Sequence, residues 1–283
     1  MTEPTAAWTT RNAPTRRIEA AGARFAYREL GPAVGVPLVL LTHLGANLDG
    51  WDPCVLDGLA QERRVIAVDY RGVGDSSGTV RDTFEGMADD VVAFLRAFGL
   101  RRVDLFGLAV GGMVAQAVAL KEPRLVDRLI LAAAAPAGGS GLASVTGTTT
   151  TSVLRAVLTF NDPKALLFFT RTTGGKHAAR QYLARLRERT TGRDKRVTPG
   201  VYRAQLAAIR RWGLQEPADL SSIAGPVLIV HGDSDRLVPA ANATELARRL
   251  PDATVTVYPD SGHGVVFQNH RAFVDAAREF LQR

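Results

Sequence analysis

The stretch VDLFGLAVGG, Val103–Gly112, decides how this sequence is interpreted. The stretch begins with a short apolar run and is followed by an apolar helix pattern. Gly107 lies two residues before Ala109, and Gly111 lies two residues after it. A strand that turns sharply into a helix needs small residues at those two positions, because larger side chains would collide. The central residue of such a turn usually carries the attacking group. Ala109 has neither a lone pair nor a proton to give, so the pattern predicts the turn without its nucleophile.

Composition limits the class of protein. The chain has 283 residues, of which 46% are hydrophobic, and this suits one α/β domain with an insertion. Its one cysteine, Cys54, allows no intramolecular disulfide, and the N-terminus lacks a secretion signal, so we expect a cytoplasmic protein with no membrane partner. The formal net charge of +7 comes mostly from arginines scattered over helix patterns, which indicates a solvated basic surface and no nucleic-acid partner. The sequence leaves the oligomeric state open, a homo-oligomer included.

Aliphatic runs alternate with helix patterns on both sides of the Ala109 turn. We expect an edge hairpin from strands 16–20 and 24–29, and further strands at 38–42, 65–68, 129–134, 225–231 and 254–258, besides the strand that begins at Val103. Helices are expected at 53–61, 86–98, 110–121, 241–250 and 271–281. Such alternation is typical of a parallel sheet with helices on both faces.

The alternation stops between residues 137 and 222. Turns rich in Gly, Ser and Thr occur there, with helix patterns at 153–158, 163–170, 178–189 and 202–212. We therefore predict a core made of residues 1–136 and 223–283, with a helical cap at 137–222.

Two loops, read together with the turn, resemble those of the α/β-hydrolase fold family. Residues 232–239, GDSDRLVP, are similar to the acid loop of that family, and residues 261–264, SGHG, to its histidine loop. Residues 69–76 also resemble the family's turn after the strand that precedes the elbow strand. The chain order of nucleophile, acid and base matches the family, and the resemblance covers nearly all of the chain. It implies an α/β-hydrolase fold: a mostly parallel eight-stranded sheet with helices on both faces and a helical cap insertion.

The same resemblance suggests roles for the polar residues. His263 would move the proton, and Asp235 would hold its ring and stabilise the imidazolium, with Asp233 as the second candidate for the acid. Each assignment has a structural alternative, namely a loop histidine bonded to the backbone for His263 and a helix N-cap for Asp235.

The backbone amides of Val110 and Leu44 would form the oxyanion hole. His43 would take the place of Leu44 if the loop were one residue tighter. Otherwise we expect His43 to be a buried histidine under that loop.

Three explanations account for Ala109. The chain is a deliberate Ser→Ala form of a Ser-His-Asp hydrolase, or a natural enzyme that uses the His263 and Asp235 dyad for proton transfer without covalent catalysis, or a binding protein without activity. The second class includes lyases, cyclases and cofactor-free oxygenases. It requires an additional polar group near Ala109.

The substrate is expected to be a small molecule, either an uncharged ester or a lactone of modest size and moderate hydrophobicity. We place His43, Phe168 and Trp212 at its binding site, and of the pair Phe168 and Phe169 we expect one to face the pocket. No dinucleotide fingerprint and no metal-ligand spacing is present in the sequence, so neither a cofactor nor a metal is expected.

Overall fold

A computed structural model describes residues 8–145, 147, 149, 151 and 162–283. The sheet has eight strands: β1 (Arg16–Ala20), β2 (Ala23–Leu30), β3 (Leu38–Leu41), β4 (Val65–Val68), β5 (Val103–Leu108), β6 (Val126–Ala132), β7 (Val227–Gly232) and β8 (Ala253–Tyr258). Their order is β1-β2-β4-β3-β5-β6-β7-β8. The β1–β2 and β2–β4 pairs are antiparallel and the others parallel, so the predicted mostly parallel eight-stranded sheet is confirmed.

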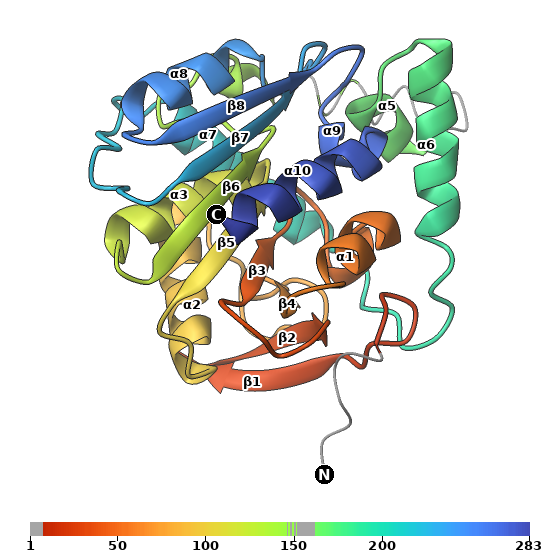
Figure 1. The fold of residues 1–283 in the computed structure, drawn as a ribbon, viewed down its shortest axis with the longest axis vertical. Helices are drawn as coiled ribbons and strands as arrows, with labels where there is room; N and C mark the ends of the chain where they lie inside the picture. The colour runs from red at the N-terminus through yellow and green to blue at the C-terminus, as the bar shows by residue number, and fades with distance from the viewer. Residues whose placement is uncertain (1–7, 146, 148, 150, 152–161) are drawn as a thin grey trace.

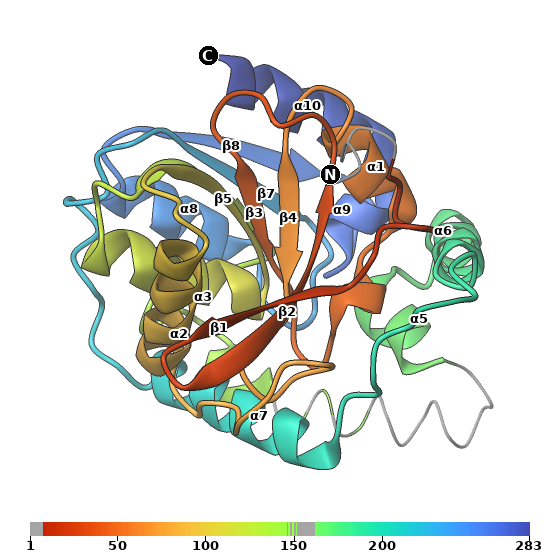
Figure 2. The same ribbon diagram turned by 90° about the horizontal axis from the view of Figure 1, so that it is seen from below.

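Helices cover both faces of this sheet, as Figures 1 and 2 show. On one side lie α2 (Phe84–Ala97), α3 (Val110–Lys121) and α8 (Ala241–Arg249), and on the other α1 (Pro53–Leu59) and α10 (His270–Gln282). Strand β5 contributes to both cores, because Leu105 packs on the α3 side and Phe106 on the α1 side. Burial on two faces explains why the central strands are continuous apolar runs.

Within the described residues, the connection from β6 to β7, residues 133–226, holds the remaining α-helices apart from α9. Its described elements are η3 (Leu142–Ser144), α5 (Pro163–Phe168), α6 (Thr173–Arg185) and α7 (Pro199–Gly213). The helix expected at 153–158 lies outside the described residues. We refer to residues 133–226 as the β6–β7 connection, and the predicted cap boundaries at 137 and 222 stay a prediction.

Two helices of the β6–β7 connection begin earlier than expected, and one helix elsewhere was not expected at all. Helices α6 and α7 begin earlier, because Thr172 and Thr198 cap their N-termini with side-chain hydroxyls that accept from the amides of Gly175 and Val201. A short helix, α9 (Val265–Gln268), follows the histidine loop and was not expected. No helix in the described part of the chain is long and apolar enough to cross a membrane.

Candidate active site

The turn between β5 and α3 has the strained geometry that the sequence predicts. Ala109 adopts φ 53° and ψ −111°, a conformation that costs a non-glycine residue of the order of 1–3 kcal/mol. A Cβ atom at Gly107 would overlap the carbonyl of Gly111, and one at Gly111 would overlap the carbonyl oxygen of Leu41. Both glycines are therefore required by the packing of β5, α3 and β3 around this turn.

His263 and Asp235 meet across their two loops. The ring Nδ1 of His263 lies 2.8 Å from Oδ2 of Asp235, and the Asp235 carboxylate has no exposed surface. Burial alone would raise the pKa of Asp235, but the charge and hydrogen bonds of His263 and His231 outweigh it and hold that pKa well below its usual range. Because Nδ1 is engaged by the carboxylate, Nε2 is the ring nitrogen left to exchange a proton.

Asp235 is not the helix N-cap that was considered as the alternative, because α8 begins at Ala241 with Ala240 at its N-cap, but its carboxylate does bind backbone amides of its own loop. Its Oδ1 accepts from the amides of Leu237 at 2.8 Å and Val238 at 3.0 Å. One carboxylate oxygen thus fixes the loop while the other holds His263.

Asp233, the second candidate for the acid, has a different position. Its carboxylate accepts from the amides of Asp260 and Ser261, each at 3.2 Å. It ties the histidine loop to β7 and makes no hydrogen bond to His263 in the described structure.

A histidine that was not singled out from the sequence lies next to the carboxylate of Asp235. His231 is completely buried, its Nε2 donates to the carbonyl of Val238 at 2.8 Å, and the same nitrogen lies 3.5 Å from Oδ2 of Asp235. Its position four residues before Asp235, at the end of an apolar strand, was the available signal.

Leu44 and Val110 line the same cavity as Ala109. Within the described residues we find no hydrogen bond donated by the backbone amide of either residue. Val110 is the first residue of α3, so the positive end of the helix dipole lies at its amide and strengthens the attraction of this N–H for a negative charge. A carbonyl oxygen that becomes negatively charged would be stabilised here.

His43 forms part of the cavity wall beside Leu44. Its Nδ1 donates to the carbonyl oxygen of Leu44 at 3.0 Å, and its ring contacts Phe168 edge-on at 4.8 Å between centroids. Burial lowers the pKa of His43 to about 3, an effect that the hydrogen bond to Leu44 only partly offsets. The imidazole is thus neutral at physiological pH.

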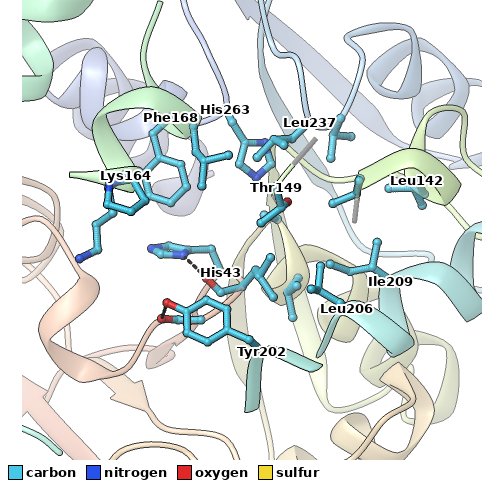
Figure 3. Close-up of a pocket in the computed structure, with 18 of the residues that line it drawn as sticks. His43, Leu142, Thr149, Lys164, Phe168, Tyr202, Leu206, Ile209, Leu237 and His263 are labelled. Atoms are coloured by element: carbon cyan, nitrogen blue, oxygen red, sulfur yellow. Dashed lines mark hydrogen bonds between the residues drawn. The ribbon is translucent and has the colours of Figure 1, made fainter. Parts of the chain in front are cut away.

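The cavity above Ala109 has a volume of about 660 Å³ and a mostly apolar lining (Figure 3). His263 lies on one side of it and His43 and Tyr202 on the other, while Phe168 and Lys164 flank one end and Leu142 and Ile209 the opposite end. The lining comprises His43, Leu44, Gly45, Ala109, Val110, Met113, Leu142, Val145, Thr149, Pro163, Lys164, Leu167, Phe168, Val197, Pro199, Tyr202, Leu206, Ile209, Leu237, Val238 and His263.

The predictions for the Phe168 and Phe169 pair and for Trp212 have different outcomes. Phe168 lines the cavity, whereas Phe169 is buried against Tyr182, with 5.5 Å between ring centroids. Trp212 is not part of the lining. It is buried against Phe84 and donates its Nε1 hydrogen to the carbonyl of Ala135 at 3.2 Å, so its placement at the substrate site is corrected to a packing role.

Thr149 was not singled out from the sequence, although it lines the cavity. Its hydroxyl is buried and has no hydrogen-bond partner in the part of the chain that the structure describes. Thr149 and His263 both line this cavity and are labelled in Figure 3. An unpaired buried hydroxyl is costly, and a polar ligand group would satisfy it.

Comparison with known proteins gives consistent matches. The family described as alpha/beta hydrolase fold matches residues 36–270. The chain is 32% identical over 267 residues to a putative carbamate hydrolase RutD from Caulobacter sp. (strain K31), across 89% of this chain and 92% of that protein. It is 27% identical to a pimeloyl-[acyl-carrier protein] methyl ester esterase from Nitrosomonas europaea, across 85% and 93% of the two chains.

A solved structure agrees with these sequence matches. An alpha/beta hydrolase fold protein from Chitinophaga pinensis superposes with a TM-score of 0.91 and 36% sequence identity. The superposition covers 97% of this chain and 99% of that one.

Proposed function

The chain belongs to the α/β-hydrolase fold family, and from this premise we propose that its cavity binds a small to medium, moderately hydrophobic carboxylic ester or lactone, which the chain with serine at position 109 hydrolyses without a cofactor. The carbonyl carbon would lie over residue 109, with its oxygen toward the amides of Leu44 and Val110. The acyl and alcohol parts would occupy the apolar cavity. The names of the carbamate hydrolase and methyl ester esterase relatives support chemistry at a carbonyl that carries a heteroatom.

The observation that carries the proposal is the His263–Asp235 pair beside the Ala109 turn. In the serine form, His263 Nε2 takes the hydroxyl proton while the oxygen attacks the carbonyl carbon, and the charge that develops on the carbonyl oxygen falls on the two amides. His263 then gives the proton to the leaving alcohol. Water, deprotonated by the same nitrogen, releases the acid and restores the serine.

With Ala109 the first step has no attacking atom, so no acyl-enzyme forms at this position. The cavity, the two amides and the dyad do not depend on the missing oxygen. Removing the nucleophile of such a triad lowers the rate by several orders of magnitude but leaves binding in place. The Ala109 chain is therefore expected to hold its ligand without turning it over.

A second candidate is proton transfer by the dyad without a covalent intermediate. The hydroxyl of Thr149 is the observation that favours it, because this group is unpaired and lines the same cavity. Such an enzyme would remove an acidic C–H or O–H proton with His263, while the amides of Leu44 and Val110 stabilise the enolate or alkoxide.

Comparison of this chain with its Ala109→Ser variant on a panel of activated esters and lactones tests the proposal, with Ala109→Ser/His263→Ala as the control. Turnover by the serine variant alone supports the hydrolase. If neither chain turns over and the Ala109 chain still binds these compounds, the hydrolase proposal fails and a binding function remains. Conversion of a carbon acid by the Ala109 chain that Thr149→Val abolishes would support the second candidate.

A further inference from the structure

The oxyanion loop, residues 43–52, connects β3 to α1 and carries Leu44. Its anchors come largely from the β6–β7 connection. The amide of Asn47's side chain donates to the carbonyl of Lys195 at 2.7 Å, and the hydroxyl of Tyr182 donates to the carbonyl of Gly50 at 3.0 Å. Segments more than 130 residues apart in the sequence are thus joined at this loop.

Helix α7 contacts the loop next to the proposed oxyanion donor. The amide of Gly45 donates to Oε1 of Gln205 at 2.7 Å, and the hydroxyl of Tyr202 donates to the carbonyl of Gly45 at 3.2 Å. The Tyr202 ring occupies the space that a Cβ atom at Gly45 would need, and Gly45 adopts φ 65°. One helix therefore fixes the orientation of both peptide groups of Gly45.

The side chain of Gln205 is unusual for a residue that only packs. Gln205 has no exposed surface, and its Nε2 has no hydrogen-bond partner among the described residues. Unpaired buried N–H groups are costly, and an apolar side chain of similar shape would avoid that cost. Within the described structure the side chain makes one polar contact, with the Gly45 amide, and we take this contact as the reason for a glutamine here.

We propose that Gln205 and Tyr202 are positioning residues for the oxyanion hole, and that α7 sets the direction of the Leu44 amide through Gly45. The proposal rests on the role of Leu44 in the proposed function. The peptide group between Leu44 and Gly45 and the peptide group between His43 and Leu44 meet at the Cα atom of Leu44. The first carries the Gly45 N–H and the second carries the Leu44 N–H. A rotation of the first therefore tilts the second, and small errors in the position of such a donor slow catalysis.

The kinetic test uses the Ala109→Ser chain. Gln205→Leu removes the acceptor, Tyr202→Phe removes only the hydroxyl, and Arg203→Gln on the exposed side of α7 is the control. We expect kcat for an ester to fall roughly tenfold to a hundredfold in Gln205→Leu, and several-fold in Tyr202→Phe, with KM nearly unchanged.

A thionoester of the same acid and alcohol distinguishes a positioning role from general damage. Sulfur accepts hydrogen bonds weakly, so a displaced amide donor slows the ester more than its thiono analogue. The ester-to-thionoester rate ratio is therefore expected to fall in the two α7 variants and to stay constant in the control. A constant ratio in Gln205→Leu would overturn the proposal.

A second measurement needs no turnover and uses the Ala109 chain. Gln205→Leu is expected to accelerate hydrogen exchange of the Gly45 amide at least tenfold and to shift the Leu44 amide resonance, with no change in Arg203→Gln. If the Ala109→Ser chain proves inactive, the proposed function fails on its own, and a Leu44 resonance that stays in place would then reject the positioning role separately.

Discussion

The buried imidazole of His43 makes the stability of the protein depend on pH. In the folded chain its pKa is about 3, against an ordinary value of 6.5. The unfolded chain therefore binds more protons than the folded chain between these values, and stability must rise with pH across this window and fall on acidification. The full gap corresponds to about 5 kcal/mol at 1.36 kcal/mol per unit.

Substitution of His43 by Gln removes this proton site and keeps an amide N–H that can donate to Leu44. At about pH 4.5 the unfolded imidazole is protonated and the folded one is still neutral, so His43 lowers the stability of the original chain by about 2.5 kcal/mol relative to about pH 7. Urea unfolding of both chains between about pH 7 and pH 4.5 gives, for each chain, the slope of the free energy of unfolding against pH. The original chain is expected to lose about 2.5 kcal/mol more than His43→Gln over this range.

The comparison of slopes separates proton linkage from packing. Any fixed cost of placing Gln beside Phe168 shifts one curve without changing its slope, and other titrating groups contribute equally to both chains. Asp104, for example, has a pKa raised by burial to about 6, so its stability contribution falls as pH rises toward that value in either chain. Curves that run parallel within about 0.5 kcal/mol would refute the account, because the folded imidazole would then accept a proton as easily as the unfolded one.

Four further predictions concern the site and its supports. In the Ala109→Ser chain, Asp235→Asn is expected to lower ester turnover about 10⁴-fold, and a loss below tenfold would contradict the assigned role. Gly111→Ala is expected to cost at least about 3 kcal/mol in urea unfolding, because its Cβ meets the Leu41 carbonyl, whereas Gly99→Ala, at φ 78° in open space, should cost about 1 kcal/mol. Arg185→Met leaves the fully buried Asp52 unpaired and should cost about 3–5 kcal/mol, against less than about 0.5 kcal/mol for Arg283→Met in an exposed pair. Trp212→Phe should lower stability by about 1 kcal/mol through the lost bond to Ala135 and leave ligand affinity within about twofold, and a larger loss of affinity would restore Trp212 to the binding site.

The strands and the loops of the site were predictable because local patterns determine them. Leu38–Leu41 and Val65–Val68 are continuous aliphatic runs, which are typical of strands buried on both faces. Gly107 and Gly111 revealed the turn, since their spacing reflects a steric requirement. The loops of Asp235 and His263 could be identified by the resemblance of residues 232–239 and 261–264 to loops of the α/β-hydrolase fold family, together with their order along the chain.

Other features depend on packing between distant segments. Trp212 has a large aromatic side chain of the kind that often binds ligands. Its position against Phe84 is set by how α7 packs on α2. The contact of Gln205 with Gly45 joins residues 160 positions apart, and no local pattern marks such a pair. Helix α9 spans only four residues, which is too short for a periodicity to be detected.

The backbone at Ala109 has one more consequence. Its strained conformation lies between Gly107 and Gly111, where a Cβ atom would overlap neighbouring backbone, and none of the backbone atoms concerned belongs to residue 109. The strained backbone at position 109 is therefore present whether or not the side chain there carries a nucleophilic atom. Under the proposed function, a protein that retains a carbonyl compound and one that cleaves it would differ by a single oxygen atom at position 109.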